Sequence, residues 1–201
     1  MNTLLVMILS YLFGSIPWAL VIGKLFYHKD IRLEGSGNLG ATNAGRVLGK
    51  KAAVSVTVLD ALKAFISMLL ASRLAPQAVL YAGLACCVGH CFPVFAQFRG
   101  GKAVATSFGF FLGITVLITH QWFWNFLLPI IVFFAVLYLT KMVSASSISA
   151  LFAEALISIF VNNSMQLSVC LFILWAFVTY RHKANIQRIM NGTESRIKWM
   201  G

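Results

Sequence analysis

The sequence predicts an all-α integral membrane protein with seven transmembrane helices, because it is unusually apolar and poor in charge. Of its 201 residues, 60% are hydrophobic and only 10% are charged, and the mean hydropathy is +0.86. Soluble domains are roughly 45–50% apolar and about 25% charged. A soluble chain of this composition could not cover its surface with polar groups. The composition therefore excludes a soluble enzyme, a disordered chain and a collagen-like fibre.

Apolar runs that match the length of a membrane span follow one another along the chain. The first run has neither the positive N-terminal region nor the small-residue cleavage site of a secretory signal, so we interpret it as a retained span. The fifth begins with Trp122 and Trp124, as expected at a membrane interface, and the sixth contains Glu154. We expect a single polytopic domain of residues 1–201 with spans at residues 4–26, 52–74, 77–98, 103–119, 122–140, 143–161 and 165–180.

The net charge of +11 indicates an orientation in the membrane. In a soluble protein it would suggest nucleic acid, but membrane proteins collect Lys and Arg on their cytoplasmic side and no soluble basic module is present. With the N-terminus outside and the C-terminus cytoplasmic, only Arg73 and the intramembrane Lys63 of the 16 basic residues are not inside, and the basic tail from Arg181 to Lys198 is cytoplasmic. This count favours seven spans over a six-span alternative that merges the fifth and sixth.

The cysteines indicate neither a disulfide framework nor a metal site. Cys86, Cys87, Cys91 and Cys170 form no C-x-x-C pair, and we interpret them as buried thiols. His90 beside Cys91 is at most half a zinc site, since zinc needs three or four ligands. We expect no metal and no cofactor.

Asp60 and Lys63 lie within the second span, three residues apart and so on one helix face. Ionised groups at such depth usually face the bundle interior and pair with one another. We interpret them as a structural ion pair, and a direct role in substrate handling is the alternative.

The first of three polar, glycine-rich segments contains residues 35–43, GSGNLGATN, followed by Arg46. Its G-x-G-x-x-G pattern lacks the βαβ context of a dinucleotide site. Glycines still let backbone N–H groups converge on an anion, and Arg46 supplies a fork suited to phosphate. The alternative is a flexible loop with a helix N-cap at Thr42 or Asn43. The candidate binding residues are Ser36, Gly37, Asn38, Thr42, Asn43 and Arg46.

The second segment contains Gly89 and His90, followed by residues 98–102, FRGGK. Gly100, Gly101 and Lys102 at the start of a helix would present backbone amides, the positive helix end and an ammonium group to a phosphate. The spacing is not that of a Walker motif. The alternative is a tight turn whose lysine extends to the membrane surface.

The third segment follows the seventh span. On one helix, Arg181, Asn185 and Arg188 would stack, with His182 beside them and Glu194 beyond. The alternative is a basic interfacial helix held by anionic lipid. Ser146 and Ser147 form a smaller group in the sixth span, for which helix packing through small residues is the alternative. All of these groups fall on the same predicted side, which suggests a cytoplasm-facing pocket for phosphorylated ligands.

The segments GSGNLGATNAGR, GHCFPVFAQFRGGKAVAT and RHKANIQRIMNGTE resemble the three motifs of the bacterial acyl-phosphate:glycerol-3-phosphate acyltransferase family, PlsY. Ala103 stands where the family usually has glycine. The resemblance implies a bacterial inner-membrane enzyme that moves an acyl group from long-chain acyl phosphate to the 1-hydroxyl of glycerol 3-phosphate, giving lysophosphatidic acid. It implies a separate cytosolic acyl-phosphate synthase as the donor's source. The roles carried over are activity for Ser36, Arg46, His182 and Asn185, glycerol-phosphate binding for Gly89, His90, Gly100, Gly101 and Lys102, donor-phosphate binding for Ser146 and Ser147, and integrity of the fold for Glu194.

An acyl phosphate already carries a good leaving group, so the enzyme needs mainly to position it and neutralise its charge. We expect the donor phosphate to accept the hydroxyl proton while Ser36, Arg46, Lys102, His182 and Asn185 hold it. His182 as general base is the competing hypothesis. The alternative functions are a transporter of an organic phosphate, which would need an outward polar path and internal symmetry, and a small structural membrane subunit.

Overall fold

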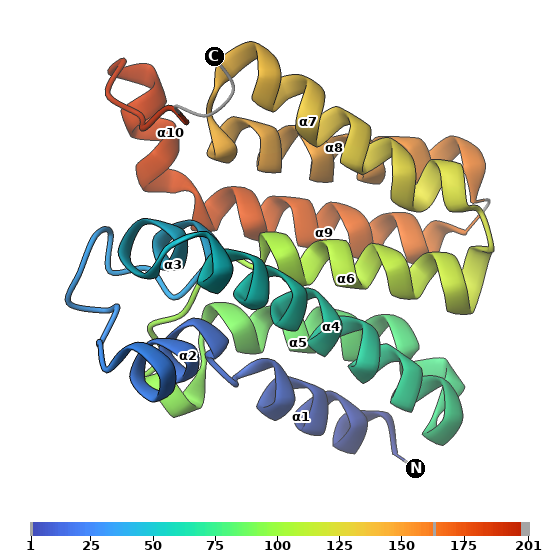
Figure 1. Ribbon diagram of the computed structural model, residues 1–201. Helices are drawn as coiled ribbons and strands as arrows, with labels where there is room; N and C mark the ends of the chain where they lie inside the picture. Colours follow the sequence, from blue (N-terminus) through green and yellow to red (C-terminus); the bar gives the residue numbers. More distant parts are fainter. Residues whose placement is uncertain (1, 163, 198–201) are drawn as a thin grey trace. The chain divides into compact units, whose positions relative to one another are not determined.

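The computed structural model describes residues 2–162 and 164–197, and within them the chain forms helices and no strands. The all-α prediction is therefore confirmed for the described chain. The helices form two compact units, Met1–Gly113 and Ile114–Gly201, which are taken in turn below (Figure 1). Lys198 of the basic tail lies outside the described residues.

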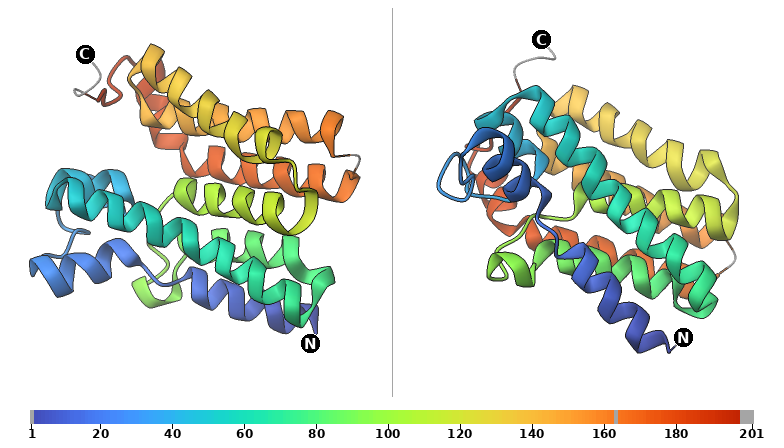
Figure 2. Two further views of the ribbon diagram at one scale, coloured as in Figure 1. Left: turned by 45° about the vertical axis from the view of Figure 1, so that its right-hand side comes forward. Right: turned by 60° about the horizontal axis from the view of Figure 1, so that its bottom comes forward.

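Unit 1 is built around contacts of α1 with α5 and of α4 with α3 and α5 (Figure 2). A Cβ atom on Gly14 of α1 would collide with the backbone of Cys86 on α5, so glycine permits this close approach. The elements are α1 (Thr3–Gly14), α2 (Trp18–Tyr27), α3 (Ala41–Leu48), α4 (Lys50–Leu74), the 3-10 turn η1 (Pro76–Ala78), α5 (Val79–Cys91), the 3-10 turn η2 (Val94–Ala96) and α6 (Val104–Ile114), which ends where unit 2 begins.

The first predicted span is not one continuous helix, because α1 ends at Gly14 and α2 begins at Trp18. Pro17 gives the reason: proline has no N–H, and it disfavours a helical conformation in the residue before it, Ile16. The segment Thr3–Tyr27 as a whole still has the length and apolarity to cross a membrane. The break exposes backbone groups inside the span that need polar partners.

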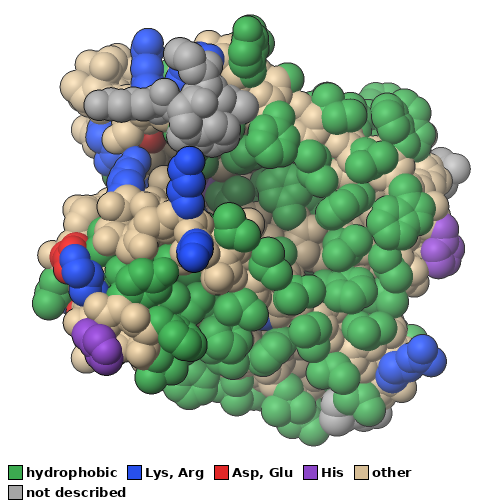
Figure 3. Space-filling view, in the orientation of Figure 1, with side chains coloured by type: hydrophobic (Ala, Val, Ile, Leu, Met, Phe, Trp, Pro, Cys, Tyr) green, Lys and Arg blue, Asp and Glu red, His purple; other side chains and the backbone are tan. Residues whose placement is uncertain are grey.

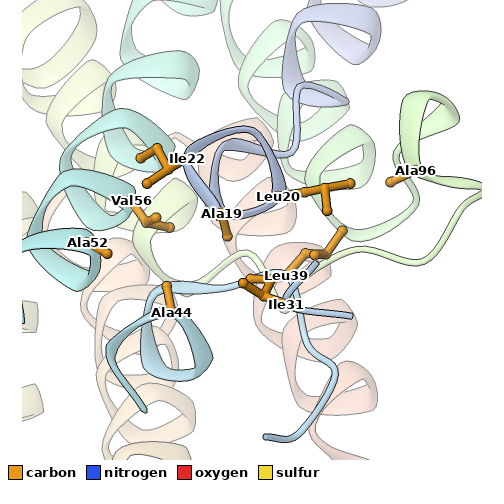
Figure 4. Packing of buried hydrophobic residues seen from close by; sticks show 9 residues of the cluster. All are labelled: Ala19, Leu20, Ile22, Ile31, Leu39, Ala44, Ala52, Val56 and Ala96. Carbon is orange, nitrogen blue, oxygen red and sulfur yellow. The ribbon is translucent and has the colours of Figure 1, made fainter. Parts of the chain in front are cut away.

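A hydrophobic cluster joins the first two glycine-rich segments within unit 1 (Figure 4). Leu39 belongs to the first segment, Ile31 precedes that segment and Ala44 follows it. Ala96 precedes the Gly-Gly-Lys turn of the second segment. Helix α2 lies against them in the same cluster. The other members are Ala19, Leu20 and Ile22 of α2 and Ala52 and Val56 of α4. Both segments therefore rest on one core.

In unit 2, α8 packs against both α7 and α9, and the three helices lie side by side (Figures 1 and 2). The unit contains two π-helical turns, η3 (Thr115–Thr119) and η4 (Phe123–Leu127), followed by α7 (Leu128–Thr140), α8 (Val143–Val161), α9 (Met165–Arg181) and α10 (Lys183–Met190). Lys141 separates α7 from α8 in a left-handed conformation with φ 60°. A merged fifth and sixth span is therefore wrong.

Asn125 of η4 and Glu154 of α8 form a buried polar pair in unit 2. Asn125 Nδ2 donates a hydrogen bond to Glu154 Oε1 at 3.0 Å. The pair ties the π-helical start of the fifth predicted span to the sixth, in the way that polar side chains link helices within membranes.

Five of the described helical segments are long and apolar enough to cross a membrane: Thr3–Tyr27, Lys50–Leu74, Pro76–Ala96, Phe123–Thr140 and Val143–Val161. Two shorter apolar segments, Val104–Thr119 and Met165–Arg181, coincide with the fourth and seventh predicted spans. Hydrophobic side chains also cover the outward face of α4 in unit 1 and of α7 in unit 2 (Figure 3). These features are those of a multi-pass membrane protein, and the count of seven spans stays a prediction.

Candidate functional site

The first glycine-rich segment is shaped by the buried side chain of Asn43. Asn43 Oδ1 accepts a hydrogen bond from the backbone N–H of Ser36 at 2.8 Å, and Nδ2 donates to the carbonyls of Ile31 at 3.1 Å and Glu34 at 3.2 Å. Asn43 thus replaces the backbone partners that an irregular loop lacks. Its predicted role in substrate binding stays a prediction, since the amide group already serves the loop.

Two glycines and an uncapped helix complete this segment. Gly35 and Gly37 have φ values of 61° and 68°, which glycine adopts without strain. Helix α3 has Gly40 as its N-cap, with no side-chain hydrogen bond. The alternative of an N-cap at Thr42 or Asn43 is therefore wrong, because both residues lie inside the helix.

Arg46 is the exposed basic residue in the last turn of α3. Arg32, which also belongs to this loop, is held by Asp30, with Nη2 2.6 Å from Oδ2 and Nε 2.9 Å from Oδ1. The hydrogen bonds from Arg32 lower the pKa of Asp30 to about 2, so this carboxylate stays charged and neutralises Arg32 at physiological pH. No ion pair within the described chain engages Arg46 in this way, which leaves its guanidinium for an anion.

Ser36 and Asn38 differ in their surroundings. Ser36 is exposed, whereas the Oδ1 atom of Asn38 is buried and has no hydrogen-bond partner within the described residues. A buried polar atom without a partner is rare in native proteins and calls for one. Asn38 Oδ1 can therefore accept a further hydrogen bond, and its role in substrate binding stays a prediction.

The second segment folds directly onto the end of α5. The backbone N–H groups of Gly100 and Gly101 donate to the carbonyls of Cys91 at 3.2 Å and His90 at 3.1 Å. The prediction that these two amides face a phosphate is therefore wrong, because the end of α5 already uses them. A Cβ atom on Gly100 would collide with the His90 carbonyl, and one on Gly101 would collide with Nε2 of the His90 ring. Only glycine fits at either position, so the residue before Lys102 is fixed against His90.

The backbone around this turn is strained at three residues other than glycine. Gln97, Phe98 and Ala103 have φ values of 55°, 59° and 59°. A left-handed conformation costs such residues roughly 1–2 kcal/mol each. Strain of this kind persists where the surrounding fold enforces it, and it is concentrated at functional sites. Ala103, which lies between Lys102 and the start of α6, is also the position at which the resembled family usually has glycine.

The predicted ion pair between Asp60 and Lys63 is present: Lys63 Nζ lies 2.8 Å from Asp60 Oδ1, and both side chains are almost completely buried. Lys63 Nζ is also 2.8 Å from His90 Nδ1 and donates to the carbonyl of Ile16 at 3.3 Å. Neither His90 nor the helix break was predicted to contact this pair. No spacing rule could have found the contacts, because they join three separate helical segments.

The third segment is not carried by a single helix. Helix α9 ends at Arg181, His182 interrupts it with φ −94° and ψ 8°, and α10 begins at Lys183. The predicted stack of Arg181 with Asn185 and Arg188 on one helix is therefore wrong. The ring of His182 is buried, and its Nδ1 lies 2.8 Å from the carbonyl of Val178. Since a carbonyl only accepts, Nδ1 carries the proton and Nε2 carries the lone pair in the neutral ring.

Glu194 binds three polar side chains of unit 2. Its Oε1 accepts hydrogen bonds from Asn185 Nδ2 at 2.6 Å and Ser144 Oγ at 2.7 Å, and Oε2 accepts from Arg188 Nε at 2.7 Å. Burial opposes the charged form, but the hydrogen bonds from Asn185, Ser144 and Arg188 outweigh it and lower the pKa of Glu194. Ser144 was missed from the sequence, because nothing in its surroundings signals a partner at position 194.

Ser146 and Ser147 are fully buried in α8. Ser146 Oγ donates to the Met142 carbonyl at 2.8 Å, and Ser147 Oγ donates to the Val143 carbonyl at 2.7 Å. These bonds within the helix agree with the packing alternative. A role in binding the donor phosphate stays a prediction and requires the hydroxyl groups to turn away from their carbonyls.

The fold and these segments define a multi-pass helical membrane protein whose glycine-rich and basic segments suit a phosphorylated ligand. Among the described residues, no group of three or more His, Cys, Asp or Glu side chains could hold a metal ion.

Comparison with known proteins agrees with this class. The family described as glycerol-3-phosphate acyltransferase matches residues 4–192. The glycerol-3-phosphate acyltransferase of Geobacillus kaustophilus is 46% identical, over 99% of this chain and 98% of the relative. That of Bacillus velezensis is 48% identical, over 97% of this chain and 97% of the relative. The chain belongs to the glycerol-3-phosphate acyltransferase family.

Two crystal structures of PlsY (YgiH), an integral membrane glycerol 3-phosphate acyltransferase, are also similar. The glycerol 3-phosphate form has a TM-score of 0.89 and 35% identity, and the lysophosphatidic acid form has a TM-score of 0.86 and 34% identity. Each comparison covers 98% of this chain and 96% of the other.

Proposed function

We propose that this protein transfers a fatty acyl group from acyl phosphate to the 1-hydroxyl of glycerol 3-phosphate, giving lysophosphatidic acid and phosphate. The observation that carries the proposal is the shared core of the first two glycine-rich segments, in a chain of this family. That core fixes two phosphate-suited loops in one rigid unit, and preorganised positioning of this kind is what the reaction needs.

Unit 1 supplies the groups that suit glycerol 3-phosphate. Arg46 and Lys102 provide positive charge for its phosphate, and the Gly100–Gly101 turn, which packs against His90, fixes the backbone that carries Lys102. Asn38 Oδ1 is available for a glycerol hydroxyl. Exposed Ser36 adds a hydroxyl group that can donate to either phosphate.

The chemical step forms one bond and breaks one. The 1-hydroxyl oxygen of glycerol 3-phosphate bonds to the acyl carbon, and the bond from that carbon to the phosphate oxygen breaks. The hydroxyl proton passes to the departing phosphate, whose charge Arg46 and Lys102 stabilise. We also expect His182 and Asn185 to be needed for activity, and the hydrogen bond from Asn185 to Glu194 holds that amide in one orientation.

His182 as general base is a second candidate for the proton acceptor, and one observation favours it. The hydrogen bond from Nδ1 to Val178 leaves the lone pair on Nε2, which is the arrangement a base needs. His182→Gln separates the two mechanisms. Base catalysis contributes roughly 10²–10⁴-fold, so activity that stays within about tenfold of wild type over the whole pH range excludes the base and leaves the donor phosphate as acceptor.

The function itself is tested on purified protein in lipid. Phosphate release that requires both acyl phosphate and glycerol 3-phosphate, with lysophosphatidic acid as product, is the expected result. Labelled glycerol 3-phosphate that accumulates unmodified inside liposomes would instead establish the transporter. Acyl-CoA and acyl carrier protein thioesters serve as controls for the donor, and neither should replace acyl phosphate.

The proposal includes a location. We place seven spans in the bacterial cytoplasmic membrane, with the N-terminus outside and the active site facing the cytoplasm. The basic residues between and after the predicted spans support this orientation. The acyl chain would enter from the membrane and glycerol 3-phosphate from the cytosol, where a separate synthase would supply acyl phosphate.

A further inference from the structure

Lys63 is the largest side chain that is fully buried in the described protein, and it touches both the broken first span and the second glycine-rich segment. An ammonium group has three N–H donors and no acceptor. The Lys63 nitrogen lies 2.8 Å from the Asp60 carboxylate, 2.8 Å from His90 Nδ1 and 3.3 Å from the Ile16 carbonyl. The cation is thus paired with an opposite charge and has two further polar neighbours, as burial of a charge requires.

The contact with Lys63 determines the protonation of His90. Because an ammonium group can only donate, Nδ1 of His90 must accept, and the proton of the neutral ring is then on Nε2. Asp60 Oδ1 lies 3.4 Å from the same Nδ1, so its negative charge faces the ring from the side of Lys63. The contact with Lys63 therefore fixes both the orientation and the tautomer of the His90 ring.

The opposite side of the His90 ring faces the Gly-Gly-Lys turn. A Cβ atom on Gly101 would meet Nε2, Cε1 and Cδ2 of the ring, and the backbone N–H of Gly101 donates to the His90 carbonyl at 3.1 Å. Any rotation of the ring would press on Gly101 and displace the turn. The ring and the backbone carbonyl of His90 together hold residues 100–102 in place.

We infer that Asp60 and Lys63 are positioning residues for substrate binding: by holding His90 in the Nε2–H tautomer against Gly101, they fix the turn that receives the phosphate of glycerol 3-phosphate. The inference rests on the proposed function for the identity of that ligand. It assigns to the intramembrane pair a role that acts through His90, without contact between the pair and the substrate.

The test uses the double variant Asp60→Asn/Lys63→Met, because removing one partner alone would leave a buried charge uncompensated. The expected result is a rise of about tenfold or more in KM for glycerol 3-phosphate, as misplacement of a binding group produces. KM for acyl phosphate and kcat should change by a smaller factor, since the glycines of the turn serve glycerol 3-phosphate alone and only Lys102 also faces the donor phosphate. Gly101→Ala, which forces the ring and the turn apart directly, should give the same pattern.

Glu154→Gln is the matched control, because it also changes a buried acidic side chain within a span but lies in unit 2 and touches Asn125. It should change the melting temperature without a selective rise in KM for glycerol 3-phosphate. If the double variant raises both KM values together, lowers kcat alone or leaves all three constants unchanged, the inference is wrong.

A spectroscopic measurement tests the network without any assay. In wild-type protein with 15N-labelled histidine, the His90 signals, assigned by their absence in His90→Gln, should show a bare Nδ1 and a protonated Nε2. A protonated Nδ1 in wild type, or the same tautomer in wild type and double variant, would overturn the inference. The wild-type spectrum is decisive even if the double variant fails to fold. Failure of wild type to acylate glycerol 3-phosphate would instead reject the proposed function.

Discussion

At the scale of single residues, the backbone conformation explains why glycine suits the position at which this chain has Ala103. Ala103 has φ 59°, in the left-handed region that favours glycine, and its side chain is completely buried. In the sequence, Ala103 is unusual only by comparison with the resembled family. Glycine suits this position because the chain must turn from Lys102 into α6 within two residues, and the turn uses a positive φ.

Ala103→Gly should leave the free energy of unfolding nearly unchanged. Relief of about 1–2 kcal/mol of strain is offset by the loss of a buried methyl worth about 0.8 kcal/mol and by the greater freedom of glycine in the unfolded chain, about 0.5–1 kcal/mol. The matched control is Ala105→Gly in α6, where glycine costs about 1 kcal/mol with no strain to relieve. Thermal unfolding in one detergent compares them, and equal losses in both variants would show that Ala103 is not strained.

Other residues combine roles that the sequence presented separately. Asn43 and His90 were expected to bind substrate, and the structure shows both holding the loops that carry other candidates. Residue type and spacing indicated that these side chains mattered. They could not show whether a polar group faces a ligand or a backbone, since both uses need the same donors and acceptors.

At the scale of helices, interruptions decide where polar groups are placed. At the break at Pro17, the Ile16 carbonyl accepts from both Trp18 N–H and Lys63 Nζ, and at the break at His182, α10 turns away from the direction of α9 (Figure 1). Proline is a visible signal for the first break. The second has none, because RHKANIQR has no glycine or proline and its pattern is that of one helix.

Glu194 joins α10 to α8 through Asn185 and Ser144, and it should stabilise unit 2 in a pH-dependent way. Because its pKa in the folded protein is below the ordinary 4.5, this stabilisation is present above pH 4.5 and is lost as pH falls through the lower folded-state value. Glu194→Gln should therefore lower the free energy of unfolding at pH 7 by about 1.5–3 kcal/mol, the contribution of a charged hydrogen bond. The melting temperature should fall accordingly, and it should depend less on pH below 4.5 than in wild type.

The control for this prediction is Glu34→Gln, which removes an exposed carboxylate 3.1 Å from Lys29. Surface ion pairs contribute about 0–1 kcal/mol, so the melting temperature should hardly change. Equal effects of the two substitutions would mean that Glu194 does not link the helices.

At the scale of the whole molecule, the orientation of the loops is the claim that most needs measurement. The four native cysteines are all buried, so single cysteines at exposed sites can report the side of the membrane. Leu33→Cys, Phe98→Cys and Ser195→Cys should react with a membrane-impermeant maleimide only from the cytoplasmic side, and Gln77→Cys only from outside. Labelling of Leu33→Cys or Ser195→Cys from outside would contradict a cytoplasmic site.

Composition, span length and local motifs were enough to predict the class of protein, the family and the glycine-rich segments, because these features depend only on neighbours along the chain. Spacing also predicted the pair of Asp60 and Lys63, which share one turn of helix. Only the tertiary structure decided that Lys63 reaches His90 and Ile16, and that Ser144 reaches Glu194. Such contacts join residues far apart in the chain, and their geometry follows from how whole helices break and pack.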